Sequence, residues 1–293
     1  MEDSDRLARQ VANYETKLRR SAGARVVAGG DPALGDLLGT IAERRSRRAR
    51  DSRPAGARTP VAPSGGAAGQ VLAVDPYGAR VRVFRIGRPD GFDFRAGQYM
   101  RVGASVGRRR KFSIASAPHE PYLELAVELR EGGQVTPALF ALRVGDSVEL
   151  GDVGGSLRLD GSAGHHLMVA TGTGIAPLRS MLRDALHRDV SSNFTVLLGA
   201  SHAEELPFHD ELVALAAGSA RVAYTATVSR PEALANRSWG GSTGRVDALA
   251  RSVAAGLDPR VTRAYAVGNA GMVATVRRDL ERLGFGVSAE SYG

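Results

Sequence analysis

The spacing of apolar residues changes near residue 160, and this change constrains the fold more than any other feature of the chain. Over residues 70–159, short runs rich in β-branched residues alternate with Gly and Pro, which predicts a closed or nearly closed antiparallel barrel interrupted by one short helix near residues 136–142. Farther on, apolar strand-like runs alternate with helical patterns, which predicts a parallel sheet with helices on both faces. We therefore predict a β domain over residues 70–160 and an α/β domain over residues 161–293.

Residues 1–69 form a separate leader region. Two candidate helices, capped by Ser4 and Asp31, are followed from Glu43 by a basic and then Pro-, Gly- and Ala-rich stretch. We predict a short helical leader that ends in a flexible linker. Residues 1–70 hold 13 Lys or Arg and 8 Asp or Glu, so most of the chain's net charge of +8 lies there. The leader either docks a partner protein or forms a weakly ordered extension or a self-association hairpin.

Composition excludes several classes of site. The chain has no cysteine, which excludes disulfides, thiolate nucleophiles and cysteine-ligated iron–sulfur clusters within it. We interpret the adjacent His165 and His166 as surface or structural residues, and we expect no metal site. The local charge excess gives no reason to expect nucleic-acid binding. Because no apolar run reaches about 20 residues and the N-terminus lacks a signal-peptide layout, we expect a cytoplasmic protein without a transmembrane segment.

The most informative local pattern runs from Ala170 to Pro177, with the sequence Ala-Thr-Gly-Thr-Gly-Ile-Ala-Pro. It follows an apolar strand and opens a helix. Gly172 and Gly174 would let the backbone turn sharply and approach a pyrophosphate, which the free N–H groups of the helix N-terminus would bind. Pro177 fits the first helical turn, where its missing N–H costs nothing. Taken alone, the pattern also fits a tight structural turn.

A second pattern, Arg110-Lys111-Phe112-Ser113-Ile114-Ala115-Ser116, lies in the barrel region. It resembles the flavin motif of the ferredoxin–NADP reductase superfamily, and Thr171 to Pro177 resembles the nicotinamide-nucleotide loop of that family. The resemblance covers about residues 70–293 and does not reach the leader. Further matches follow in the order of the family: Gly97-Gln98, Gly132-Gly133-x-Val135-Thr136, Gly145-Asp146, Trp239-Gly240 with Gly244-Arg245-Val246, Gly268-Asn269-x-x-Met272, and the tail Glu290-Ser291-Tyr292-Gly293.

This resemblance implies a flavin-binding barrel followed by a Rossmann-like domain, with FAD and NAD(P)H as cofactors. It implies that Arg110 pairs with the flavin phosphates, Phe112 stacks on the isoalloxazine ring and Ser113 places a hydroxyl near the flavin nitrogen that receives hydride. The catalytic residues that it implies are Ser113, Glu290 and Tyr292. The implied cofactor-binding residues are Arg110, Lys111, Phe112, Ser113, Gly132, Gly133, Val135, Thr136, Thr171, Gly172, Thr173, Gly174, Pro177, Ser229, Arg230, Gly268, Asn269 and Met272.

Each implied role has a purely structural alternative, and the chain departs from the family pattern in places. Phe112 could be an ordinary core aromatic residue, and Ser113 a solvated barrel residue. Phe112 stands where Tyr is commoner, so a phenol hydrogen bond to the flavin would be missing. Val267 stands where the family commonly has Cys, which would slow hydride transfer or alter cofactor preference. The run from Gly151 to Gly155 replaces the usual Gly-Pro-x-Gly at the domain junction.

Three hypotheses about function follow from the resemblance. The first is a reductase that moves electrons from NAD(P)H through bound FAD to a separate protein acceptor with an acidic docking surface, such as a ferredoxin-like carrier or an oxygenase. The second is a flavin reductase that releases reduced flavin. The third is a non-catalytic nucleotide-sensing or electron-transfer subunit. An arginine such as Arg230 would suit the 2′-phosphate of NADPH, whereas Ser-Arg-Pro before Trp239-Gly240 and Gly244-Arg245-Val246 also resembles NADH-using relatives and slightly favours NADH. The oligomeric state stays open.

Overall fold

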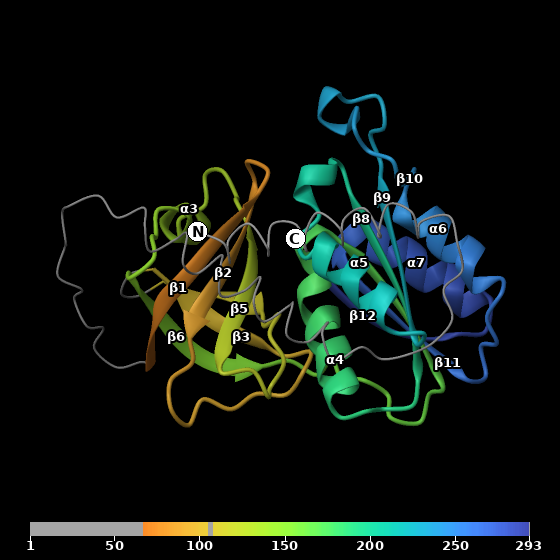
Figure 1. Ribbon diagram of the computed structural model, residues 1–293, viewed down its shortest axis with the longest axis horizontal. Coiled ribbons are helices and arrows are strands. Elements are labelled where there is room, and N and C mark those ends of the chain that lie inside the picture. Colours follow the sequence, from red (N-terminus) through yellow and green to blue (C-terminus); the bar gives the residue numbers. More distant parts are fainter. Residues whose placement is uncertain (1–66, 105–107, 293) are drawn as a thin grey trace, which may run out of the picture.

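The computed structural model describes residues 67–104 and 108–292, which form two domains side by side (Figure 1). The predicted leader lies outside the described residues, apart from Ala67–Gly69. The first domain is an antiparallel sheet with the strand order β4-β3-β6-β1-β2-β5. A bridge between Ile114 and Leu125 joins its two edges, which confirms the predicted barrel. The strands are β1 (Ala67–Tyr77), β2 (Val81–Gly87), β3 (Tyr99–Gly103), β4 (Arg110–Ser113), β5 (Tyr122–Glu128) and β6 (Ser147–Gly154).

The barrel forms because its strands alternate apolar and polar residues, which places one side of each strand inside. Phe84, Met100 and Leu123 are among the buried side chains that fill the interior. The short helix α3 (Val135–Phe140) lies where a helix was predicted, and its Leu139 packs into the same core. Strand β1 begins at Ala67 because Ala67–Gly69 pair with β6, so the barrel starts three residues before residue 70.

The second domain is a parallel sheet with the strand order β10-β9-β8-β7-β11-β12. Its strands are β7 (His165–Thr171), β8 (Asn193–Ala200), β9 (Val222–Val228), β10 (Ser242–Thr243), β11 (Thr262–Asn269) and β12 (Gly286–Tyr292). Its helices are α4 (Ile175–His187), α5 (His209–Gly218), α6 (Val246–Ala254) and α7 (Ala270–Arg282), with short 3-10 turns η1 (Gly172–Gly174), η2 (Ala203–Glu205) and η3 (Leu234–Asn236). The parallel pairing confirms the predicted Rossmann-like architecture.

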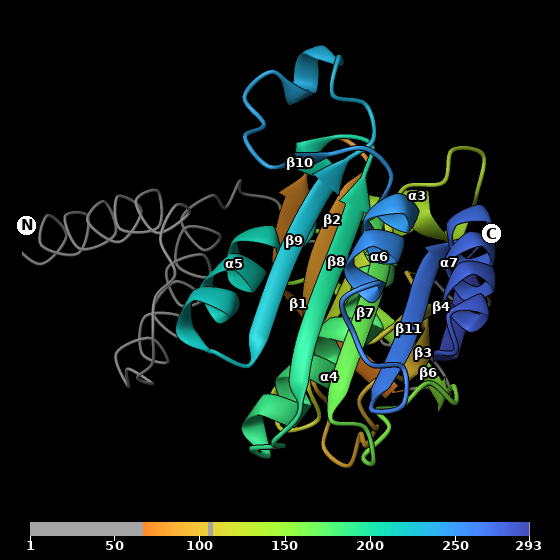
Figure 2. The same ribbon diagram turned by 90° about the vertical axis from the view of Figure 1, so that its right-hand side faces the viewer.

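The helices cover both faces of this sheet (Figure 2). Helices α4 and α5 bury one apolar cluster with one side of the strands, and α6 and α7 bury a second cluster on the other side. The sequence patterns did not indicate α6 or β12. Helix α6 packs through an apolar stripe at helical spacing, in which Leu249 and Val253 adjoin the buried residues Val246, Ala250 and Ala254.

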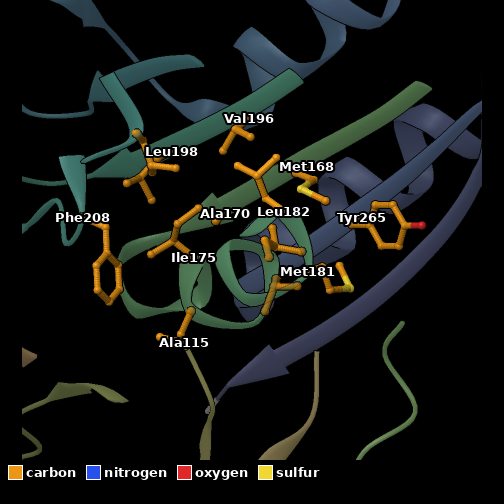
Figure 3. Close-up of a cluster of buried hydrophobic side chains, with 14 of the residues drawn as sticks. Ala115, Met168, Ala170, Ile175, Met181, Leu182, Val196, Leu198, Phe208 and Tyr265 are labelled. Carbon is orange, nitrogen blue, oxygen red and sulfur yellow. The ribbon is translucent and has the colours of Figure 1, made fainter. Parts of the chain in front are cut away.

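The cluster around α4 crosses the domain boundary. Figure 3 shows Ile175 and Leu182 of α4 close to Ala170 of β7 and Leu198 of β8, with Ala115 of the barrel at the edge of the same group. Burial of each large aliphatic side chain contributes about 1.5–3 kcal/mol relative to exposure. The two domains therefore share a core at this boundary.

The adjacent histidines His165 and His166, which we interpreted from the sequence as surface or structural residues, both lie in β7. His166 is fully buried in β7, where it stacks on Phe194 with ring centroids 5.0 Å apart and lies 3.4 Å from the hydroxyl of Tyr265, so its role is structural. His165 is half-buried and lies 2.9 Å from the hydroxyl of Thr195. Within residues 67–104 and 108–292, no helix has the length and apolar character needed to cross a membrane.

Candidate active site

A cavity of about 1320 Å³ lies between the two domains, and both contribute to its wall. The α/β domain contributes residues from the carboxyl ends of β7, β8, β9, β11 and β12. Ligands of open parallel sheets bind at this edge, because the connecting loops and helix N-termini meet there. The cavity exceeds the usual range for one small ligand, about 300–1,000 Å³, so it has room for parts of two.

Strands β3 and β4 form the barrel side of this wall. Arg110, Lys111, Phe112 and Ser113, which are consecutive in the sequence, all line the cavity. Phe112 also packs partly against the barrel core, so it has both of the environments considered from the sequence. Tyr99, which is paired across the strands with Ser113, also lines the cavity and was missed; the Nζ of Lys111 lies 4.7 Å from its ring centroid.

Two adjacent arginines in this wall differ in their partners. The Nε of Arg109 lies 3.1 Å from Oε2 of Glu149, whose side chain is only 6% exposed. Arg110 is exposed and makes no ion pair within the described parts of the chain. Arg110 is therefore the one of the two that can offer its guanidinium to an anionic ligand without leaving a buried carboxylate unpaired.

The loop before α3 lines the cavity through Gly133, Gln134, Val135 and Thr136, whereas Gly132 does not reach it. The hydroxyl oxygen of Thr136 accepts a hydrogen bond from the backbone N–H of Arg130 at 2.9 Å. Thr136 is one of the cofactor-binding residues that the resemblance implies. In the structure its hydroxyl closes the loop on itself, which leaves the backbone of the loop to face the cavity.

The two glycines of the nucleotide-loop pattern have different surroundings. A Cβ atom at Gly172 would meet no other atom within 4 Å, so this position faces open space. A Cβ at Gly174 would lie 2.3 Å from the carbonyl oxygen of Val267, so only glycine lets the loop pack against β11. Thr171, Gly172 and Thr173 line the cavity, whereas Gly174 and the buried Pro177 do not.

The ends of β7 and β11 are bonded to each other beside this loop. The hydroxyl oxygen of Thr171 accepts a hydrogen bond from the backbone N–H of Asn269 at 2.9 Å. The side chain of Asn269 in turn accepts from the N–H groups of Gly271 and Met272, which caps α7. Gly268, Asn269 and Met272 all line the cavity. Val267 is fully buried and packs in the apolar core of the α/β domain, not in the cavity wall.

The last strand reaches across to the barrel. The hydroxyl groups of Ser113 and Tyr292 lie 2.6 Å apart, which is a short hydrogen bond between the domains. Burial raises the pKa of Tyr292, and its bond to Ser113 partly opposes that shift. Burial also raises the pKa of Glu290, against the positive charge of Lys111. The three residues that the resemblance marks as catalytic therefore line the same cavity, and one of them, Glu290, has a carboxyl with a raised pKa.

Of the two residues predicted to contact the ribose of the nucleotide, Ser229 and Arg230, the structure brings only one to the cavity. Ser229 lines it, but Arg230 does not. The side chain of Asn236 donates to the carbonyl of Arg230 at 2.7 Å and to that of Ser201 at 3.0 Å, which fixes the course of the chain after β9. Arg245 lines the cavity instead and is the only basic residue that the described α/β domain contributes to the wall.

These features fit two nucleotide cofactors. The barrel wall supplies cations, an aromatic ring and a hydroxyl, which suit a flavin and its phosphates. The glycine loop before α4 supplies an open backbone at a helix start, which suits a second pyrophosphate. The fold and the cavity therefore define a flavin- and nicotinamide-dependent oxidoreductase.

Comparison with known proteins agrees with this class. Residues 77–159 match the oxidoreductase FAD-binding domain family, and residues 168–278 match the oxidoreductase NAD-binding domain family. The chain is 40% identical over 188 residues to ferredoxin–NADP reductase B of Sorangium cellulosum, covering 61% of this chain and 75% of that protein. It belongs to the ferredoxin–NADP reductase superfamily and is an NAD(P)H-dependent flavoprotein reductase.

Other relatives share less of their length with this chain. It is 30% identical to the reductase component of the naphthalene 1,2-dioxygenase system of Pseudomonas putida, over 51% of this chain and 46% of that protein. It is 34% identical to a probable flavin reductase of Vibrio harveyi, over 47% of this chain and 62% of that protein. A similar solved structure is a ferredoxin–NADP⁺ reductase from Neisseria gonorrhoeae with bound FAD and NADP, with 25% identity, a TM-score of 0.68, and coverage of 78% of this chain and 99% of that one.

Proposed function

We propose that this reductase passes electrons from NAD(P)H, through FAD, to a separate acceptor protein that is a ferredoxin-like carrier or an oxygenase component. The observation that carries the proposal is the shared cavity, in which the flavin motif of the barrel and the nucleotide loop of the α/β domain face each other. Bound FAD supplies the chemistry that links a two-electron donor to one-electron acceptors. A cytoplasmic location, where reduced nicotinamide nucleotides are available, is part of this proposal.

In the barrel, Arg110 and Lys111 would bind the FAD phosphates and Phe112 would contact the flavin ring. A guanidinium offers donors in a fixed planar fork, and Arg110 has no competing carboxylate among the described residues. The backbone of Gly133 to Thr136 would complete the phosphate site. The domain boundary at residues 160/161 remains part of this proposal, whereas the barrel includes Ala67–Gly69.

In the α/β domain, the segment from Thr171 to Gly174 would hold the nicotinamide nucleotide. Gly172 would allow close approach of the phosphates, and Gly174 would let the loop lie against β11. Arg245 would contact the ribose end of the nucleotide, a role that the sequence assigned to Arg230. Because Asp247 already pairs with Arg245 at 2.9 Å, its charge is partly compensated, and the choice between NADH and NADPH stays open.

Ser113, Glu290 and Tyr292 would orient the reacting groups. The short bond between Ser113 and Tyr292 holds the two domains at the reacting end of the cavity. Glu290 would lie beside this pair in the cavity wall, where burial raises the pKa of its carboxyl against the charge of Lys111.

The acceptor would have an acidic docking surface. The support is the charge of residues 1–70, which hold 13 basic and 8 acidic residues. Attraction of this kind weakens with salt. Removal of residues 1–66 should leave FAD binding and ferricyanide reduction unchanged and should weaken only the reaction with the acceptor protein, an effect measured as KM for the acceptor at two salt concentrations. Loss of FAD binding in the shortened chain would contradict this part of the proposal.

A second candidate is a flavin reductase that releases its flavin. The identity to a probable flavin reductase and the Phe-Ser-Ile-Ala-Ser sequence favour it. Gel filtration of FAD-loaded protein separates the two functions, because an electron-transfer protein keeps its FAD. The decisive assay then supplies NAD(P)H with either a ferredoxin or free riboflavin. We expect faster ferredoxin reduction with FAD retained; turnover of free riboflavin with loss of FAD would establish the alternative.

A further inference from the structure

The boundary between the domains also has a closed side, where α4 packs against the barrel. Arg179 of α4 is only 3% exposed. Its Nη1 donates to the carbonyl of Ala115 at 2.7 Å and lies 2.9 Å from Oε2 of Glu124, and both groups belong to the barrel. Its Nε and Nη2 donate to the two carboxylate oxygens of Glu211 in α5, at 2.9 and 2.7 Å. One guanidinium thus joins α4 to the barrel and to α5.

Neighbouring side chains of α4 hold the next residues of the same barrel segment. The hydroxyl of Ser180 donates to the carbonyl of Ser116 at 2.6 Å, and both residues are fully buried. The Nη2 of Arg183 lies 2.5 Å from Oε1 of Glu120, whose Oε2 accepts from the backbone N–H of Ala117 at 2.6 Å. Three successive barrel residues are therefore held from one helix.

The charges in this group balance. Arg85 of the barrel pairs with Glu124 at 2.7 Å, so three arginines, 85, 179 and 183, face three glutamates, 120, 124 and 211. Burial of ion pairs contributes little net stability, because desolvation offsets most of the attraction. Planar guanidinium groups with several partners do fix direction and distance, however. The arrangement suits a role in geometry more than one in stability.

The held segment and the helix both lead directly to the reacting cavity. Ala115 follows the cavity residue Ser113 by two positions, and α4 begins immediately after the loop that ends at Gly174. We propose that Arg179 is a positioning residue, which fixes the distance between Ser113 and the glycine loop through α4. This proposal rests on the function proposed above, in which these two parts hold FAD and NAD(P)H.

The test uses a pair of substitutions that keeps the charge balance. In the double variant Arg179→Met with Glu211→Met, Glu124 keeps Arg85 and Glu120 keeps Arg183. Arg188→Met is the matched control, because Arg188 directly follows α4 as its C-cap, and its ion-pair partner at 2.7 Å, Asp184, belongs to that helix and not to the barrel. All proteins are studied as full chains.

The first measurement is geometric and needs no cofactor. Because the chain has no cysteine, Leu72→Cys in β1 and Ser252→Cys in α6 provide unique sites for two spin labels, and both positions are exposed. Pulsed electron paramagnetic resonance then gives the distribution of distances between the domains. We expect a narrow distribution in the parent and the Arg188→Met control, and a broadened or shifted one in the double variant.

The second measurement is kinetic, on protein loaded with FAD and assayed with ferricyanide. We expect kcat of the double variant to fall roughly 10-fold or more, because misplacement by about 1 Å can cost about 100-fold. KM for NAD(P)H should change by no more than about twofold, since the binding residues are intact. Arg188→Met should leave both constants unchanged.

An unchanged distance distribution or an unchanged kcat in the folded double variant overturns the proposal. If the double variant does not fold, Ser180→Ala decides, because it removes one bond to the barrel and no charge. It should broaden the distribution and lower kcat by a smaller factor, and no change in kcat would overturn the proposal. If the parent itself binds no FAD, the proposed function fails, while the distance measurement still tests the geometric part.

Discussion

The two sides of the domain boundary use similar residue types in different ways. On the closed side, the guanidinium groups of Arg179 and Arg183 are bonded to carboxylates, and that of Arg179, whose side chain is only 3% exposed, is also bonded to the barrel backbone. On the open side, Arg110 faces the cavity without an ion-pair partner among the described residues. The contrast indicates that satisfied charges hold the domains together and that free ones are available to ligands.

The two sides also differ in how they treat carboxyl groups. Burial alone would raise the pKa of Glu211, but Arg179 and Arg183 lower it to about 2. On the open side, burial raises the pKa of Glu290, and the opposing charge of Lys111 is the smaller influence. Single substitutions that unbalance the buried charges of the closed side should therefore change stability, whereas removal of an unpaired charge on the open side, such as Arg110, should change binding or turnover.

The largest effect is expected on the closed side, for Glu211→Gln. The change leaves buried arginines without full compensation and should cost about 4 kcal/mol of unfolding free energy, measured by urea denaturation at pH 7. A carboxyl with a lowered pKa stabilises the fold above the unfolded value of 4.5, and this contribution is lost as pH falls toward about 2. The parent should therefore lose more stability in that range than Glu211→Gln. Glu281→Gln, at an exposed pair with Arg277, should have little effect and is the control.

The next effect separates two glycines of one loop. Gly174→Ala should cost about 2 kcal/mol or more of stability, because its Cβ would overlap the carbonyl of Val267. Gly161→Ala, at an open position, is the stability control. Gly172→Asn, with a residue that tolerates the positive φ of this position, should instead raise KM for NAD(P)H with FAD still bound, since its side chain would enter the cavity. Equal stability of the Gly174→Ala and Gly161→Ala variants would show that the loop does not pack as described.

Two adjacent arginines test the same contrast within the barrel wall. Arg110→Ala should weaken FAD binding by about 2 kcal/mol with the melting temperature of the FAD-free protein unchanged. Arg109→Ala should lower that melting temperature, because Glu149 would be left buried and unpaired. FAD fluorescence titration and thermal denaturation of both variants provide the measurements. The distinction between the two arginines would be contradicted if Arg109→Ala weakened FAD binding and Arg110→Ala lowered the melting temperature.

Arg245→Ala should weaken nucleotide binding and should also lower stability, because Asp247, whose side chain is only 10% exposed, would lose its partner. Arg245 is the one basic residue that the described α/β domain contributes to the cavity wall. Its removal should raise KM for NADPH by roughly 10-fold, which corresponds to about 1.4 kcal/mol, and should raise KM for NADH by less. Arg230→Ala is the matched control and should leave both unchanged. A larger effect of Arg230 would restore the assignment made from the sequence.

The smallest effect is expected for Tyr292→Phe, which removes the hydroxyl bonded to Ser113. Loss of one neutral hydrogen bond should change the kinetic barrier or stability by about 1 kcal/mol. Glu290→Gln sharpens this test through pH. A carboxyl with a raised pKa destabilises the fold as pH rises above the unfolded value of 4.5, so the variant should be the more stable protein at pH 8 and less dependent on pH. Thermal denaturation at pH 4 and pH 8 gives the comparison.

Much of the fold could be predicted because apolar periodicity differs between a barrel and a βα repeat. The cavity wall could be predicted in part because strand β4 and the loop after β7 carry recognisable short motifs. Arg230 was assigned to the cavity, but the direction of the chain there depends on Asn236, whose bonds the sequence does not reveal. Thr136 lines the cavity as the resemblance implies, and the sequence does not reveal that its hydroxyl oxygen also accepts a hydrogen bond from the backbone of Arg130.

The closed side could not be predicted at all. Arg179, Glu124 and Glu211 come from three elements that are distant in the sequence, and each alone resembles an ordinary surface charge. Only the packing of α4 against the barrel brings them together. Helix α6, in contrast, was missed although its apolar residues recur at helical spacing and could have predicted it.

The central claim is that one cavity holds both FAD and NAD(P)H in position to react. Its most direct test is the absorption spectrum of the FAD-loaded full chain during anaerobic titration with NADPH and, separately, NADH. We expect FAD to stay with the protein on gel filtration and its visible bands to bleach with a stoichiometric amount of at least one of the two nucleotides. FAD that elutes free of the protein, or bands that neither nucleotide bleaches, would contradict the account.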